Sequence, residues 1–257
     1  MKIISIAIQK GGAGKTTTTL NLAAALREAG KSCLLVDLDP QAGLSQSLGF
    51  HNEPSPNTYH LLKREAAGIP GPPEDAIIEK SGLYLIPASL ELASAELELV
   101  SVYGREHILA QVLQRLERRY DFVLLDCPPS IGMLTVNALV ASDAILMPLT
   151  PEFLSLRGAN SFLRHLELVR RLNAGIDLLG LVLTRYDARK TMTREVEAQL
   201  LQDYGRDKVF NTCIRTSIAL AKAQRAGTDI FSFDKNANGA KDYRALATEF
   251  LSKIGSK

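Results

Sequence analysis

The sequence predicts an α/β fold: a mostly parallel, doubly wound sheet with helices on both faces, in a single domain over residues 1–257. Two observations predict it. Short runs of Val, Ile and Leu alternate with amphipathic segments almost throughout, and continuous apolar runs are typical of strands buried on both faces. The 257 residues are 46% hydrophobic, which suffices for one substantial core, and no linker or repeat divides them.

Each expected element has its own sequence signal. The strand candidates are the apolar runs at residues 3–8, 32–38, 83–87, 122–126, 144–149, 178–184 and 209–213. The helix candidates are residues 15–29, 105–119, 156–172, 194–204 and 239–254, and Gly30 is the stop signal of the first. Ligands of such sheets bind beyond the carboxyl ends of the strands, so the residues that follow each strand are the candidates for function.

A glycine-rich turn follows the first strand and leads directly into a helix that opens on Lys15 and Thr16. Glycines let consecutive backbone N–H groups form an anion nest, and the helix N-terminus adds partial positive charge. Lys15 is placed to reach the β- and γ-phosphates of a nucleotide, and the Thr16 hydroxyl to bind Mg²⁺. The predicted phosphate-binding residues are Lys10, Gly11, Gly12, Ala13, Gly14, Lys15, Thr16 and Thr17.

This turn departs from the standard phosphate loop. In G-x-x-x-x-G-K-[ST] the first glycine would stand where this chain has Gln9, and an additional lysine, Lys10, precedes Gly11 and Gly12. The pattern K-G-G-x-G-K-[ST] resembles the deviant Walker A motif of the ParA/MinD family of P-loop ATPases, and most closely the ParA/Soj-type partition ATPases. In that family the early lysine reaches across a nucleotide-sandwich dimer, so the resemblance implies that Lys10 completes the site of a second copy. A glycine-rich turn with surface lysines is the alternative.

Two carboxylates, Asp37 and Asp39, stand at the end of the second strand. Asp39 is the candidate catalytic residue, together with Lys10 and Lys15, because it is placed to face the γ-phosphate and hold the attacking water or a Mg²⁺-bound water. The alternative is a polar turn capped by Asp before Pro40. The sequence D-x-D-P-Q resembles switch I of the family.

The apolar run at residues 122–126 ends in Asp126, as a Walker B strand does. Thr16 and Asp126 are therefore the predicted metal residues, because Asp126 would hold the hydration shell of Mg²⁺. Pro128 and Pro129 follow and resemble the D-x-P-P sequence of the family's switch II.

Two later segments carry candidates by resemblance. Residues 183–189 resemble the family segment beside the base, which makes Thr184 and Arg185 candidate contacts of the nucleobase or ribose. Residues 213–227 resemble the C-terminal segment that contributes to nonspecific DNA binding. There Arg215, Lys222 and Arg225 are the candidate phosphate contacts, and Lys222 occupies a position that is usually acidic. A strand-end loop and a solvated helix face are the respective alternatives.

Charge is unevenly distributed although the net charge is only +2. Residues 1–150 hold 12 Lys/Arg and 16 Asp/Glu, whereas residues 151–225 hold 13 and 8, which leaves −4 and +5 respectively. This favours a local basic face over a chain that binds polyanions everywhere. Three cysteines without metal-type spacing, no signal peptide and no apolar segment of 18 residues predict a cytoplasmic protein without a membrane span.

The resemblance implies a partition ATPase that dimerises around ATP, binds DNA nonspecifically and hydrolyses ATP slowly under stimulation by a ParB-like or other cargo adaptor. Its cofactors would be ATP and Mg²⁺, and the ATP-bound form would associate with the nucleoid.

A MinD-like membrane-associated regulator is the first alternative, although no basic amphipathic tail follows Ile254. A reductase like the nitrogenase iron protein would need paired bridging cysteines, and only Cys127 lies near switch II. The third alternative is an interaction protein with an inactive site.

Overall fold

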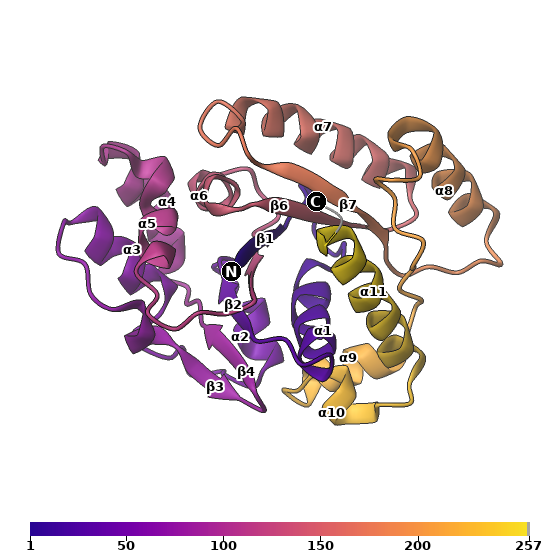
Figure 1. Cartoon of the computed structure of the whole chain (residues 1–257), viewed down its shortest axis with the longest axis horizontal. Coiled ribbons are helices and arrows are strands. Elements are labelled where there is room, and N and C mark those ends of the chain that lie inside the picture. Colours follow the sequence, from indigo (N-terminus) through magenta and orange to yellow (C-terminus); the bar gives the residue numbers. More distant parts are fainter. Residues whose placement is uncertain (256–257) are drawn as a thin grey trace.

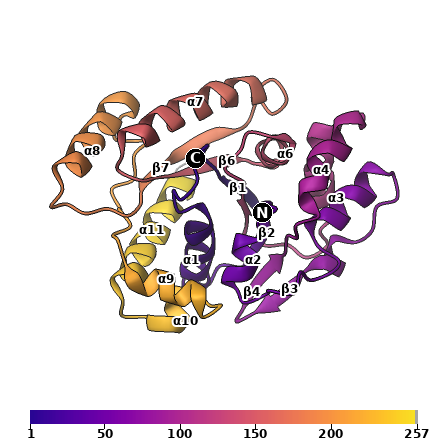
Figure 2. The same ribbon diagram turned by 180° about the vertical axis from the view of Figure 1, so that it is seen from behind.

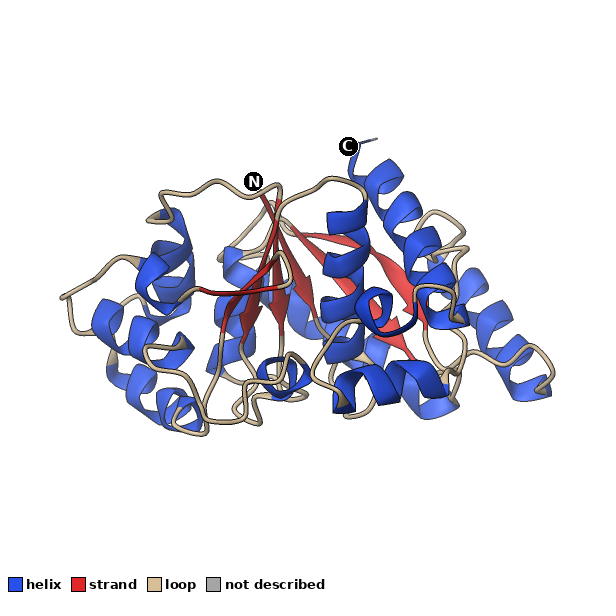
Figure 3. Ribbon diagram, turned by 90° about the horizontal axis from the view of Figure 1, so that it is seen from below, coloured by secondary structure: helices blue, strands red, loops and turns tan. Residues whose placement is uncertain are grey.

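A computed structural model describes residues 1–255 as a seven-stranded sheet between two layers of helices (Figures 1 and 3). The strand order is β3-β4-β2-β5-β1-β6-β7. All neighbouring strands are parallel except β3 and β4, which are antiparallel. The strands are β1 Lys2–Ile6, β2 Cys33–Asp37, β3 Ile78–Lys80, β4 Leu83–Ile86, β5 Phe122–Asp126, β6 Ala144–Leu149 and β7 Asp177–Leu183. The predicted fold class is confirmed.

The helices occupy the connections between the strands. They are α1 Lys15–Glu28, α2 Gly43–Ser47, α3 Thr58–Ala66, α4 Leu92–Glu98, α5 Ile108–Gln114, α6 Met133–Ala141, α7 Phe153–Val169, α8 Thr191–Tyr204, α9 Ile218–Arg225, α10 Ile230–Asp234 and α11 Asn238–Gly255. Short 3₁₀ turns are η1 Pro73–Ala76, η2 Leu99–Ser101 and η3 Arg105–His107. Figure 2 shows α3 and α4 at one end of the molecule and α8 at the other. Within residues 1–255, no helix has the length and hydropathy needed to span a bilayer.

Two apolar clusters lie on opposite faces of the sheet, because successive strand residues point to opposite sides. In β2, Leu34 and Val36 belong to the cluster covered by α3 to α8, whereas Leu35 belongs to the cluster covered by α1, α2, α9, α10 and α11. Leu35 and its neighbours in the central strands are fully buried. The burial of both faces explains why these strands are continuous apolar runs in the sequence.

The carboxyl ends of the parallel strands lie at one edge of the sheet, and the two labelled termini lie at the opposite edge (Figure 3). The segments that follow β1, β2, β5, β6 and β7 therefore meet at this edge. It is the place at which open parallel sheets bind their ligands.

The strand predicted at residues 209–213 is wrong. Val209 makes one isolated bridge to Leu181, and the chain pairs with β7 again only near Ile214, whose N–H donates to the Leu183 carbonyl. Between these points Glu249 of α11 accepts from the N–H groups of Asn211 and Thr212, so a side chain takes the hydrogen bonds that a strand would use. The antiparallel edge strand β3 was not predicted from the sequence.

The helix predicted at residues 105–119 is also partly wrong. It is divided into η3 and the shorter α5, which ends at Gln114. Beyond it, the Glu117 N–H donates to the Glu74 carboxylate and the Arg118 guanidinium stacks 3.8 Å from the centre of the Tyr84 ring. These tertiary contacts outweigh the helical propensity of the charged run. A helix was predicted at residues 156–172, and α7 begins and ends three residues earlier. The turn at residues 170–172 is not helical.

Candidate functional site

The loop between β1 and α1 has the backbone that an anion nest requires. Gly12 and Gly14 have φ angles of 72° and 87°, in the left-handed region that side chains disfavour. Gly14 caps α1, and its carbonyl accepts the Thr18 N–H at 2.8 Å. The φ angles of the loop therefore require glycine at both positions, and the loop ends at a helix N-terminus.

Lys15 lies folded back over the loop. Its side chain is buried, and its Nζ donates to the Lys10 carbonyl at 3.0 Å. Burial lowers the Lys15 pKa, and the neighbouring Asp126 opposes this shift. A desolvated ammonium beside this glycine-rich loop is suited to bind an anion with several charged oxygens.

The two predicted metal residues are in direct contact. The Thr16 hydroxyl donates to Asp126 at 2.7 Å, and the Thr19 hydroxyl donates to its other oxygen at 3.3 Å. Asp126 ends β5 next to Asp37, its register partner at the end of β2. The loop, the first helix and two strands thus place hydroxyl and carboxylate oxygens at one point.

Both of these carboxylates are fully buried, and their pKa values are raised. Burial raises the pKa of Asp126 well above its usual value, and the proximity of Asp37 raises it further. Burial likewise raises the pKa of Asp37 to about 6, although the N–H and hydroxyl of Ser45 donate to it. Two like charges buried side by side form a local excess of negative charge. A divalent cation with oxygen ligands would neutralise it.

Asp39 lies beyond β2 and faces the same space. Its Oδ1 accepts the Gln41 N–H at 2.9 Å, which fixes the turn before α2. A cavity of about 260 Å³ joins Asp39 to the loop, to Pro129 of switch II and to Arg185; its lining is Gly11, Gly12, Gly14, Lys15, Thr16, Thr17, Asp39, Pro129 and Arg185. The structure thus brings the candidate water-positioning carboxylate to the predicted phosphate site.

Lys10 is engaged within its own chain. Its Nζ donates to Glu152 at 2.5 Å, to Ser155 at 2.7 Å and to Thr150 at 3.1 Å. These three residues lie between β6 and the first turn of α7. The contact with Lys10 lowers the Glu152 pKa, because it favours the carboxylate. Phe153 and Leu154, directly after Glu152, are 53% and 69% exposed, so an apolar surface adjoins this lysine.

Thr184 and Arg185 lie beside the loop. The buried Thr184 hydroxyl donates to the Ala13 carbonyl at 2.9 Å, so this side chain supports the loop from behind. Arg185 has a φ of 51° and lines both the phosphate cavity and a neighbouring cavity of about 310 Å³. That second cavity is bounded by the residues that follow β7, by α9 and by α11, and its lining includes Ile214, Ser217, Gln224 and Tyr243. It has the position and the apolar walls that a nucleobase would need.

The three candidate DNA contacts differ in their surroundings. The Arg215 guanidinium donates to both carboxylate oxygens of Asp242, at 2.6 and 3.1 Å, and this pair joins the start of the α9 segment to α11. Lys222 and Arg225 are exposed on α9, and within residues 1–255 no hydrogen bond or ion pair holds their side chains. Arg215 therefore has a structural partner, and the two α9 side chains are available to solvent.

Three site contacts were missed by sequence reasoning. Glu152 follows β6, and only the fold brings it to Lys10. Gln224 donates to the Thr17 hydroxyl at 3.0 Å and connects α9 to the loop. Glu96 of α4 accepts the N–H groups of Met133 and Leu134, at 2.8 and 3.2 Å, and so caps α6 directly after switch II. No short-range pattern signals these contacts.

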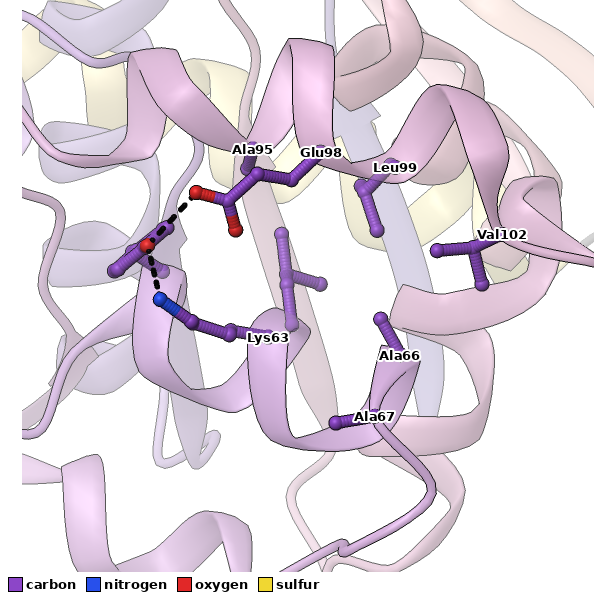
Figure 4. Close-up of a pocket in the computed structure, with 9 residues that line it drawn as sticks. Lys63, Ala66, Ala67, Ala95, Glu98, Leu99 and Val102 are labelled. Atoms are coloured by element: carbon purple, nitrogen blue, oxygen red, sulfur yellow. Dashed lines mark hydrogen bonds between the residues drawn. The ribbon is translucent and has the colours of Figure 1, made fainter.

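A separate apolar cavity of about 230 Å³ lies between α3 and α4 (Figure 4). Its walls are Ala66, Ala67, Ala95, Leu99 and Val102. At one side Tyr59 donates to Glu98 and accepts from Lys63. Among the described residues, none of the predicted site residues lines it. The phosphate cavity and this one are distinct features of the molecule.

Comparison with known proteins identifies relatives over nearly the whole chain. A family model described as an AAA domain matches residues 1–178. The chromosome-partitioning ATPase Soj of Thermus thermophilus is 41% identical over 252 residues, which cover 98% of this chain and 96% of that protein. The sporulation initiation inhibitor protein Soj of Bacillus subtilis is 38% identical over 249 residues, which cover 96% and 97%.

Solved structures share the fold. Cobyrinic acid a,c-diamide synthase from Mycobacterium smegmatis, with bound ADP and magnesium, has a TM-score of 0.85 at 35% identity over 100% of this chain and 96% of that chain. A putative plasmid partition protein from Borrelia burgdorferi bound to AMPPNP has a TM-score of 0.82 at 27% identity, over 98% and 99%. The cell division ATPase MinD of Pyrococcus furiosus has a TM-score of 0.76 at 28% identity, over 98% and 99%. With its Lys10–Lys15 loop and full-length relatives, this chain belongs to the ParA/Soj family of P-loop ATPases with a deviant Walker A motif.

Proposed function

We propose that this protein is a partition ATPase that binds ATP and Mg²⁺, dimerises around the nucleotide, and then binds DNA nonspecifically. The observation that carries the proposal is the convergence of Lys15, Thr16 and Asp39 on one cavity at the carboxyl edge of the sheet. The names of the Soj relatives, and the nucleotides and magnesium bound in solved relatives, support the same reading. An adaptor bound to DNA or to a protein cargo would stimulate hydrolysis, as in the family that the motifs resemble.

In this proposal the loop N–H groups and Lys15 bind the β- and γ-phosphates. Thr16 and Asp126 would hold Mg²⁺, which supplies positive charge that stabilises the transferring phosphoryl group. The donor set fits such an ion, because a hydroxyl and a buried carboxylate meet at 2.7 Å beside a second buried carboxylate. The pair formed by Thr16 and Asp126 would open to admit it.

Asp39 would orient the attacking water. Its Oδ1 is held by the Gln41 N–H, so the carboxylate is fixed without being buried. A fixed acceptor beside the γ-phosphate position is the usual requirement for positioning water in such enzymes. Arg185, Thr184 and the adjoining cavity would receive the ribose and base.

Lys10 would act in the partner's site. To do so it must leave Glu152, Ser155 and Thr150, so dimerisation exchanges three contacts within the chain for contacts with phosphates of the second copy. The exposed Phe153 and Leu154 beside it offer apolar surface for the dimer contact. Lys222 and Arg225 would contact DNA phosphates, and the bound dimer would associate with the nucleoid.

Two loop lysines test the nucleotide and dimer steps separately. Lys15→Ala should abolish ATP binding, because the phosphates lose their cation. Lys10→Ala should bind ATP but remain monomeric in sedimentation experiments. If Lys10→Ala dimerises with ATP as the wild type does, the role in the partner's site is excluded.

A salt titration of fluorescent-duplex anisotropy tests DNA binding. The wild type with ATP should bind with a steep salt dependence, each neutralised phosphate adding about −0.9 to the log–log slope. Lys222→Glu and Arg225→Glu should flatten the slope and weaken binding to all sequences alike. Arg215→Glu is a less clean probe, since it also breaks the pair with Asp242.

Equal DNA affinity with ATP and ADP would contradict the proposal. Binding to anionic vesicles in place of DNA would favour the MinD-like alternative.

A further inference from the structure

The C-terminal ends of α2 and α9 meet on one side of the nucleotide site. Two residues after the end of each helix stands a glycine with a left-handed backbone, Gly49 at φ 82° and Gly227 at φ 68°. The two glycines touch: a Cβ on Gly227 would lie 2.8 Å from the Gly49 Cα, closer than real Cβ contacts. Glycine is therefore required at Gly227 both by its φ and by the neighbouring helix end.

One ammonium joins the two helix ends. Lys80, the last residue of β3, donates to the Leu48 carbonyl at 2.6 Å and to the Gly227 carbonyl at 3.0 Å. Carbonyls at helix C-termini carry partial negative charge, and two such ends repel each other when they converge. The Lys80 ammonium neutralises both, so it acts as an electrostatic clamp across the junction.

Both helices also contact the nucleotide site. Helix α2 follows Asp39, and its Ser45 donates to Asp37 through both its N–H and its hydroxyl. A Cβ on Gly43, the first residue of α2, would lie 3.6 Å from the Thr16 hydroxyl. Helix α9 contributes Gln224, in its last turn, which donates to Thr17 in the first turn of α1. A shift of switch I on nucleotide binding would therefore move α2 directly, and a shift of the phosphate loop and α1 would move α9.

We propose that α2 and α9 form a single unit, clamped by Lys80 at the Gly49–Gly227 contact, that passes the state of the nucleotide site to Lys222 and Arg225. Lys80 is thus a positioning residue for DNA binding, 142 residues before Lys222 in the chain, and it lines neither of the two cavities at the nucleotide site. The DNA part of this inference rests on the proposed function. Apolar packing supports rigid coupling, because Leu44, Leu48, Leu220 and Ala223 belong to one cluster.

The decisive quantity is the ratio of DNA affinities with ATP and with ADP. Lys80→Met should reduce this ratio from the range of roughly 5- to 150-fold that is typical of allosteric coupling to within about twofold of one. ATP affinity and ATP-dependent dimerisation should stay unchanged, since Lys80 lies outside both sites. Lys80→Arg should restore the ratio, because a guanidinium can also donate to two carbonyls. Lys31→Met, which removes an exposed charge elsewhere, is the matched control.

A glycine pair provides an independent test. Gly227→Ala and Gly68→Ala both place alanine at a left-handed position after a helix, with φ 68° and 72°. Only the first meets another helix; around Gly68 no described atom lies within 4 Å of the added Cβ. Gly227→Ala should lose the ATP/ADP difference, and Gly68→Ala should retain it. An unchanged ratio in both Lys80→Met and Gly227→Ala would overturn the proposal.

Hydrogen exchange separates this inference from the function on which it rests. ATP should change the exchange rates of the amides at residues 225–228 in the wild type, and Lys80→Met should abolish that response. If the wild type binds no DNA but shows this response, the proposed DNA role fails and the coupling stands. If the wild type binds DNA only with ATP while these amides do not respond to ATP, the coupling fails and the DNA role stands.

Discussion

The Lys10 ammonium lies 2.5 Å from a carboxylate oxygen of Glu152 in the same chain. The two residues are separated by 142 positions in the sequence. A lysine proposed to serve a second copy is thus held by its own chain when no partner is present. The strength of this contact should set how readily the dimer forms.

Glu152→Gln should make dimerisation easier, because it removes the charge that holds Lys10. A partly exposed ion pair contributes roughly 1 kcal/mol or less, so the ATP concentration for half-maximal dimerisation should fall by about fivefold or less. Analytical ultracentrifugation across an ATP series measures it. Glu167→Gln breaks an exposed pair with Arg170 elsewhere on α7 and is the control. A higher ATP requirement in Glu152→Gln would mean that Glu152 supports the dimer.

Asp39→Ala should trap the ATP-bound dimer. Loss of a positioned catalytic group lowers turnover by roughly 10²-fold or more, and ATP affinity should change little. Asp39→Asn separates the two roles of the side chain, because its amide oxygen can still accept the Gln41 N–H. Phosphate release and sedimentation with ATP give the two readouts. Normal hydrolysis by Asp39→Ala would place the catalytic group elsewhere.

Asp126→Asn should stabilise the nucleotide-free protein and abolish Mg²⁺-dependent hydrolysis. The amide keeps an acceptor for the Thr16 hydroxyl and replaces one of two adjacent buried carboxylates. Burial raises the Asp126 pKa, and the proximity of Asp37 raises it further, so ionised Asp126 is costly in the folded protein. Thermal unfolding in EDTA should show a higher midpoint than the wild type. A lower midpoint would indicate that the charge itself holds the Thr16 contact together.

Gly132→Ala should destabilise the segment that follows switch II. A Cβ there would lie closer to the Glu96 carboxylate than real Cβ contacts allow, because this carboxylate occupies the space and caps α6. The Glu96 carboxylate would have to swing aside and give up the cap, which costs about 0.5–2 kcal/mol. In a double-mutant cycle by denaturant unfolding, Gly132→Ala should cost much less once Glu96 is Ala. Additive effects would show that the two residues do not compete for this space.

Local sequence patterns predicted a large part of the fold. Strands β5 and β6 have the predicted bounds, 122–126 and 144–149, because they are apolar runs with a clear change of composition at each end. The bounds failed where side chains from distant segments replace backbone hydrogen bonds, as Glu249 does at Asn211 and Thr212. A periodicity argument contains no information about such partners.

The sequence by itself determined the positions of the phosphate loop, of Asp39 and of Asp126, because each follows an apolar strand and parallel strands end at one edge. Only the tertiary structure decided that Lys10 pairs with Glu152, that Arg215 pairs with Asp242, and that Lys80 joins two helix ends. The strand order and the packing of helices bring these groups together from 27 to 147 positions apart. Local propensity acts over a few residues, whereas these contacts depend on how the whole chain is folded.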